Sequence, residues 1–96
     1  MAEALMRKRF TLYGDVQGVG LRWRARHAAD AAGAVGWVRN ERDGSVTMEL
    51  QGTEAQLDRV MAGIERGLYI RVAAMDVKSV PVEEDARGFA VRDDRW

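Results

Sequence analysis

Apolar and polar residues alternate in several short segments of the chain, which is the pattern of strands with one buried face. This alternation, bounded by glycine and proline, predicts strands at residues 8–16, 35–41, 45–51, 72–80 and 89–92. Phe10 and Leu12 share the apolar face of the first strand. In the fourth strand, Met75 and Val77 are the expected inward pair.

Two other segments have the period of a helix. Between Leu21 and Ala32 the apolar positions recur at i, i+4, i+7, i+8 and i+11, and Gly33 follows as a stop signal. Most of these positions are alanine, so this helix can lie close to whatever it covers. Thr53 and Gln56 form a capping box that begins a second helix. The buried stripe predicted for that helix comprises Leu57, Val60, Met61, Ile64 and Leu68.

The resulting order, β-α-β-β-α-β plus a short terminal strand, is the split β-α-β arrangement of ferredoxin-like folds. We expect an α+β fold, a two-layer sandwich whose antiparallel sheet carries both helices on one face. The length predicts a single domain over residues 1–96, with residues 1–7 as a loosely ordered N-terminus. The chain lacks a membrane-spanning run and the start lacks the features of a signal peptide, which predicts a cytoplasmic protein.

Composition then limits the chemistry. Fifteen basic and fifteen acidic residues cancel, which argues against a broad surface for nucleic acid or membranes. The chain has no cysteine and one histidine, His27, so thiolate nucleophiles, cysteine zinc sites and two-histidine metal sites are excluded. Catalysis, if there is any, must come from side chains such as Arg and Asn and from the backbone.

The strongest local signal is a glycine-rich loop, Gly14-Asp15-Val16-Gln17-Gly18-Val19-Gly20, between the first strand and the first helix. Backbone N–H groups at a helix N-terminus bind anions, and Arg22 in the first turn adds a guanidinium suited to a phosphate. The dinucleotide and P-loop glycine motifs are absent, which favours a small phosphate group. Taken alone, a plain strand-to-helix turn and a solvated arginine explain the same residues.

The second candidate is Asn40, near the end of the second predicted strand. If Val38 points inward, Asn40 lies on the same face two residues later. A polar side chain there needs partners. It either hydrogen-bonds to backbone or holds a water or a ligand oxygen.

Two stretches resemble the signatures of the acylphosphatases. The run from Leu12 to Arg22 resembles the first, Gly-x-Val-Gln-Gly-Val-x-aromatic-Arg. The second is resembled by Gly36-Trp37-Val38-Arg39-Asn40 with the later Gly44-Ser45-Val46 and Gly52. Both occur in the family's order and separation, and the resemblance covers nearly the whole chain. The chain departs from the family at Leu21, where an aromatic residue is usual, and at Asp15, whose carboxylate we expect to point to solvent or pair with an arginine.

The resemblance implies hydrolysis of acyl phosphates, mixed anhydrides of a carboxylic acid and phosphate, to carboxylate and inorganic phosphate. It implies catalytic roles for Arg22, which would hold the phosphoryl group, and Asn40, which would orient the attacking water. The backbone that would bind the substrate belongs to Gln17, Gly18, Val19, Gly20 and Leu21. A carboxylate leaves easily, so positioning and charge stabilisation suffice, and the resemblance implies no metal and no cofactor. The expected partners are a small acyl phosphate and inorganic phosphate, with neither nucleic acid nor membrane, for a monomeric enzyme.

Three alternatives share the topology. The first is a non-catalytic phosphate- or anion-binding module, which would not need the amide of Asn40. The second is an RNA-binding domain, which stacks bases on sheet aromatics where this chain has Thr47, Glu49 and Gln51. The third is the acylphosphatase-like domain of the large carbamoyl-transfer maturation proteins. The lack of cysteine-rich zinc modules favours an isolated enzyme over this third alternative.

Overall fold

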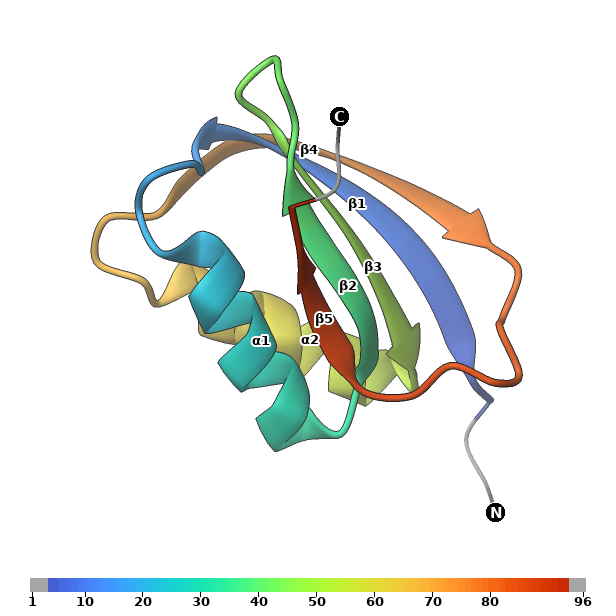
Figure 1. Ribbon diagram of the computed structural model, residues 1–96. Helices are drawn as coiled ribbons and strands as arrows, with labels where there is room; N and C mark the ends of the chain where they lie inside the picture. Colours follow the sequence, from blue (N-terminus) through green and yellow to red (C-terminus); the bar gives the residue numbers. More distant parts are fainter. Residues whose placement is uncertain (1–3, 94–96) are drawn as a thin grey trace.

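A sheet and a pair of helices form the two layers of the molecule (Figure 1). The computed structural model describes residues 4–93. Within them the elements follow in the order β1 (Met6–Asp15), α1 (Leu21–Ala32), β2 (Val35–Asn40), β3 (Val46–Gly52), α2 (Glu54–Glu65), β4 (Arg71–Val80) and β5 (Phe89–Arg92). This is the predicted order, and the α+β class is confirmed. Across residues 4–93, no helix is both long enough and apolar enough to cross a membrane.

The five strands lie in the order β4-β1-β3-β2-β5. The first four pair antiparallel, as predicted. The expectation of a wholly antiparallel sheet is wrong at one edge, because β5 pairs parallel to β2, with Gly36 beside Phe89. The segment between β4 and β5 crosses the end of the sheet and reverses the chain, so β5 runs in the direction of β2 (Figure 1).

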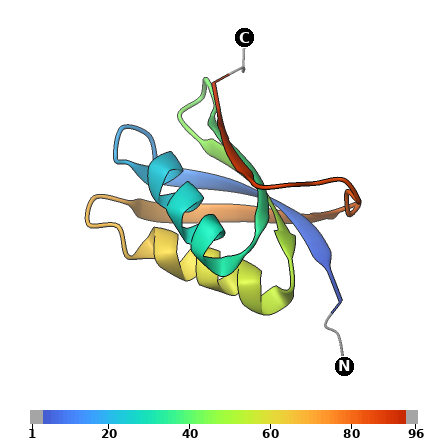
Figure 2. The ribbon, with the colours of Figure 1, turned by 60° about the horizontal axis from the view of Figure 1, so that its bottom comes forward.

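Both helices cover the same face of the sheet (Figure 2), and the core lies between the layers. Central strand β3 contributes Val46, Met48 and Leu50 to the core, all fully buried. The alanine stripe of α1 is buried at Ala25 and Ala29, which lets this helix approach the sheet closely. The capping box at the start of α2 is present as predicted, with Thr53 and Gln56 bonded reciprocally.

The edges of the core differ from the prediction. Met75 and Val77 pair with Leu12 and Phe10, so they do share the core-facing side of the sheet. They remain 42% and 45% exposed, because β4 is an edge strand that the helices do not cover. Leu68 is not part of a buried stripe: α2 ends at Glu65, and Leu68 is 91% exposed in the following turn.

The N-terminal part of the sheet starts earlier than predicted. β1 begins at Met6, and Arg7 is buried on the sheet face opposite the helices, where it bonds Glu49 and Gln51. Residues 6 and 7 therefore belong to the sheet and are not a loosely ordered N-terminus. Residues 1–3 of that prediction lie outside the described residues.

Candidate active site

The glycine-rich loop connects β1 to α1 and is fixed at both ends by buried apolar side chains. Val16 and Leu21 are each 1% exposed, so leucine at position 21 still fills the anchoring position. Between them, Gly18 and Gly20 have φ of 72° and 79°, a left-handed conformation that favours glycine. Gly20 is the N-cap of α1 and provides no side-chain cap, which leaves the N–H groups at this helix end without a side-chain acceptor.

Gln17 braces the loop against the β2–β3 turn. Its Nε2 donates to the carbonyl of Glu41 at 2.6 Å and to that of Ser45 at 2.9 Å. The turn is itself closed by Asp43, whose carboxylate accepts from the Ser45 hydroxyl at 2.6 Å and from its N–H. These hydrogen bonds hold the pKa of Asp43 below its ordinary value. The side chain of Gln17 thus positions the loop beside the end of β2.

Arg22 lies in the first turn of α1, where the sequence predicts it. Its Nη1 donates to the carboxylate of Asp93 and, at 3.5 Å, to the carbonyl of Arg92. The Nε and Nη2 groups have no partner among residues 4–93, and the side chain is 30% exposed. One nitrogen is therefore anchored at the C-terminal end of β5, while the other two can donate in parallel to an oxyanion.

Asn40 ends β2 on the same side of the sheet as buried Val38, two residues earlier. Its Oδ1 is buried and has no hydrogen-bond partner within residues 4–93. Buried acceptors are nearly always satisfied, because an unsatisfied one costs about 1–3 kcal/mol. The alternative that this oxygen simply bonds to backbone is thus excluded for the described residues, and a water or ligand remains as its natural partner.

The loop, Arg22 and Asn40 surround one hollow of about 310 Å³. It is lined by Val16, Gly18, Gly20, Leu21, Arg22, Trp23, Arg26, Asn40 and Val91. The two residues predicted to act together, Arg22 and Asn40, come from different elements and meet here. Of the predicted binding residues, Val19 lines a neighbouring groove instead, and Gln17 acts on the turn. A phosphoryl group fits the chemistry of this hollow, which offers a guanidinium and glycine backbone on one wall and an amide oxygen on another.

Several other residues were assigned from sequence. Asp15 is exposed at the end of β1, so the expectation that it points to solvent is confirmed. His27 is a surface residue whose ring meets that of Trp23 edge to face at 4.7 Å. Asp93, directly after β5, pairs with Arg22. Asp94 lies outside the described residues.

Asp93 and Arg26 are the site residues that the sequence reasoning missed. Arg26 follows Arg22 by one helical turn, a spacing that could have indicated it. No local pattern identifies Asp93, because its contact with Arg22 spans 71 residues. Among residues 4–93 there is no cluster of three or more His, Cys, Asp or Glu side chains that could hold a metal ion.

The fold is a two-layer α+β sandwich, and its hollow combines a guanidinium, glycine backbone and a buried amide oxygen. Residues 8–91 match the family model Acylphosphatase. The chain is 41% identical to an acylphosphatase of Oceanobacillus iheyensis, over 82% of this chain and 89% of that one. It is 47% identical to the acylphosphatase of Mesorhizobium japonicum, over 76% and 73% of the two chains.

Solved structures agree with these relatives. The crystal structure of acylphosphatase from Bacillus subtilis superposes with a TM-score of 0.83 at 28% identity, and covers 94% of this chain and all of that one. Full-length HypF also matches, with a TM-score of 0.81, but at 18% identity and over 12% of its length it shares the fold alone. This chain belongs to the acylphosphatase family, and its activity is the hydrolysis of acyl phosphates.

Proposed function

We propose that the hollow is the active site, and that Arg22 and the backbone N–H groups of residues 17–21 hold the phosphoryl group of the substrate. Asn40 orients the attacking water. The observation that carries this proposal is the buried, unpartnered Oδ1 of Asn40 on the wall of a hollow that also contains the open donors of Arg22. A fixed acceptor opposite fixed cationic donors is the arrangement that water attack on a bound phosphoryl group requires.

The reaction needs few groups. The amide Oδ1 of Asn40 accepts one O–H of the water, which aims a lone pair of the water oxygen at phosphorus. As the new P–O bond forms, the bond between phosphorus and the acyl oxygen breaks, and its electron pair leaves with the carboxylate. One water proton passes to a phosphate oxygen. The guanidinium of Arg22 and the N–H groups of the loop stabilise the charge on the oxygens of the transferring group.

This chemistry makes the enzyme independent of metal ions. A carboxylate leaves without protonation, and Arg22 supplies the cationic charge that a metal supplies in many phosphoryl-transfer enzymes. We expect full activity in excess EDTA, measured as release of inorganic phosphate. Loss of activity with EDTA and its return with Mg²⁺ would contradict metal independence.

We also propose that the chain works as a single domain and a monomer in the cytoplasm. The absence of cysteine fits a reducing compartment. The monomer is tested by sedimentation across a hundredfold range of protein concentration, where a constant molecular mass is expected.

The second candidate is a module that binds phosphate without turnover. The same hollow would hold the anion, but the unpartnered amide oxygen of Asn40 would repel a phosphate oxygen, which disfavours this candidate. Steady-state hydrolysis of benzoyl phosphate, with inorganic phosphate as a competitor, separates the two. The enzyme turns over and phosphate inhibits competitively. A rise in melting temperature with phosphate, together with no turnover, would favour the binding module.

A further inference from the structure

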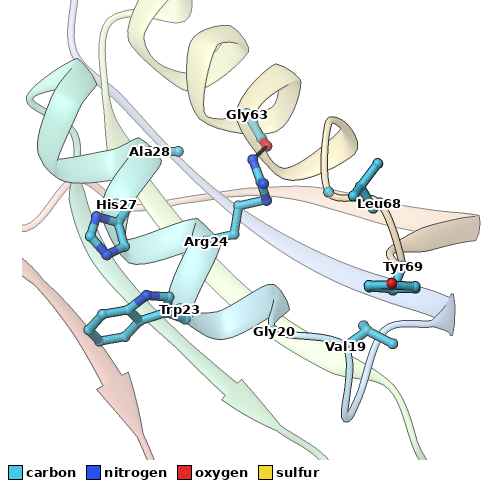
Figure 3. Close-up of a pocket in the computed structure, with 10 residues that line it drawn as sticks. Val19, Gly20, Trp23, Arg24, His27, Ala28, Gly63, Leu68 and Tyr69 are labelled. Carbon is cyan, nitrogen blue, oxygen red and sulfur yellow. Dashed lines mark hydrogen bonds between the residues drawn. The ribbon is translucent and has the colours of Figure 1, made fainter.

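A second hollow of about 600 Å³ lies next to the proposed active site, between α1 and the C-terminal end of α2. In Figure 3, Trp23 and Arg24 project from α1, Val19 from the loop, and Tyr69 from the turn after α2. We call this hollow the interhelix groove. The two hollows are direct neighbours, because Gly20 and Trp23 line both of them.

The groove gathers exposed apolar surface. Trp23, Leu68 and Tyr69 are 63%, 91% and 77% exposed, and they are the three most exposed large apolar side chains among residues 4–93. All three line the groove. A single exposed apolar residue needs no explanation, but a cluster around a concave surface marks a binding site. The arginine that lines the groove, Arg24, donates to the carbonyl of Gly63 at 3.2 Å and so bridges the two helices (Figure 3).

The groove adjoins the proposed phosphoryl site, from which the leaving group departs. In phosphoryl transfer the attacking and leaving oxygens lie roughly in line on opposite sides of phosphorus. Asn40 of β2 and Val91 of β5 line the active-site hollow on the sheet side of α1. The groove opens on the other side, toward α2. A substrate whose phosphorus faces a water on Asn40 can extend its acyl group past Gly20 and Trp23, which line both hollows.

We propose that the interhelix groove binds the acyl part of the substrate, and that Leu68 and Tyr69 there favour acyl phosphates with a bulky apolar acyl group, such as an aryl group. Trp23 and Tyr69 offer aromatic surfaces and Leu68 an aliphatic one. The proposal rests on the proposed active site, since the groove is useful only if phosphorus is held by Arg22 next to it. Leu68 and Tyr69 are specificity-determining residues, which act on the acyl group and not on the reacting atoms.

The test compares benzoyl phosphate with acetyl phosphate. In wild type and in the double variant Leu68→Ser/Tyr69→Ser, kcat/KM is measured for both substrates, and the benzoyl-to-acetyl ratio is compared. We expect the ratio to fall about tenfold in the variant, the size of effect that loss of a small apolar contact produces. The matched control is Leu5→Ser, which changes another exposed leucine at the opposite end of β1 and is expected to leave the ratio unchanged.

Binding without turnover gives a second measurement. Phenacylphosphonate and 2-oxopropylphosphonate are carbon-bridged analogues of the two substrates that cannot be hydrolysed at the bridge. Wild type is expected to bind the phenacyl compound more tightly as a competitive inhibitor, and the double variant to lose about tenfold of that preference. Inorganic phosphate, which does not reach the groove, serves as the reference inhibitor.

Each outcome separates the groove from the active site. If the benzoyl-to-acetyl ratio and the inhibitor preference are the same within twofold in wild type and the double variant, the acyl-binding groove is wrong, while the proposed active site stands. If wild type self-associates, the double variant does not, and the ratio is unchanged, the groove is a contact between copies of this chain instead. If Arg22→Ala hydrolyses acetyl phosphate like wild type, the proposed active site itself fails.

Discussion

Arg7 and Arg22 are the same residue type in opposite circumstances. Arg7 is 3% exposed on the sheet face away from the helices, and it donates to Glu49 at 2.7 Å and to Gln51 at 3.2 Å. Glu49 in turn accepts from Arg9 at 2.8 Å. Arg22 is 30% exposed, with one nitrogen anchored and two without a partner among residues 4–93.

The difference separates a structural network from the proposed active site. Around Arg7, the charged groups satisfy one another, which leaves nothing to bind a ligand and makes the cluster a part of the sheet. Around Arg22, the donors and the buried oxygen of Asn40 are left open toward the same hollow. Charge and residue type are shared by the two clusters, so it is the unsatisfied hydrogen-bonding capacity that singles out the proposed active site.

The largest expected effect is the loss of activity in Arg22→Ala. Removing one preorganised charged donor from the phosphoryl group is expected to reduce kcat/KM for benzoyl phosphate by about 3 kcal/mol or more, over a hundredfold. Stability should change by less than about 1 kcal/mol, because the ion pair with Asp93 is exposed. Arg59→Ala, which removes an exposed arginine from α2, is the control and should retain activity. Equal activity in the two variants would contradict the role of Arg22.

Glu49→Gln is expected to lower stability and to leave activity unchanged, which is the reverse of the effect of Arg22→Ala. The change removes the buried carboxylate partner of Arg7 and leaves it only the exposed carboxylate of Glu83 at 3.4 Å, which should lower the free energy of unfolding by roughly 3 kcal/mol. The kcat of the folded variant should stay within twofold of wild type, because Glu49 does not line the hollow. Urea unfolding and a benzoyl phosphate assay measure the two quantities. A folded variant with impaired kcat would show that the two clusters are not separate.

The pH dependence of stability tests the same network. Burial raises the pKa of Glu49, but the hydrogen bonds and charges of Arg7 and Arg9 outweigh it, so the pKa lies below the ordinary value of 4.5. A lowered pKa in the folded state stabilises the protein above pH 4.5, and this contribution is lost as the pH falls through the folded-state pKa. The stability difference between wild type and Glu49→Gln should therefore shrink steadily below pH 4.5. A stability difference that stays constant down to pH 3 would contradict the lowered pKa of Glu49.

Asn40→Ala is expected to have a smaller effect, on catalysis alone. Without the amide oxygen the water is no longer aimed, so kcat should fall by roughly 2 kcal/mol, about thirtyfold. The inhibition constant of inorganic phosphate should stay within threefold, because Arg22 and the loop remain. Loss of phosphate affinity in proportion to kcat would mean that Asn40 binds the phosphate and does not orient the water.

The smallest effect is expected for Asp93→Asn. The carboxylate of Asp93 anchors Nη1 of Arg22 and fixes the guanidinium, so its loss should lower kcat about threefold, or roughly 0.7 kcal/mol. The variant Asp93→Glu, which keeps a carboxylate, should retain most of the wild-type kcat. The opposite result, tighter phosphate inhibition with higher kcat/KM, would mean that Asp93 competes with the substrate for Arg22.

The parts that could be predicted from sequence are local. The periodicity gave the order of the elements, and glycine spacing indicated the loop that ends at Arg22. Val38 indicated the face on which Asn40 lies. The meeting of Arg22 with Asn40 across the hollow came only from the resemblance to a family, because no spacing within one element brings them together.

The features that could not be predicted from the sequence depend on contacts between residues far apart in the chain. The Arg22–Asp93 pair spans 71 residues, and the Arg7–Glu49 hydrogen bond spans 42. The apolar residues of β4 follow the alternation, but their exposure depends on which strand lies at the edge of the sheet. Leu68 continues the period of α2 beyond the point where that helix ends, and its exposure places it in the groove.

Whether water attacks a phosphoryl group held in the hollow is tested most directly by the position of bond cleavage. Wild type hydrolyses benzoyl phosphate in ¹⁸O-labelled water, and the products are analysed by mass spectrometry. If Asn40 aims the water at phosphorus, one labelled oxygen enters the inorganic phosphate of each turnover and none enters the benzoate. Label in the benzoate would mean attack at the acyl carbon and would contradict this account of the site.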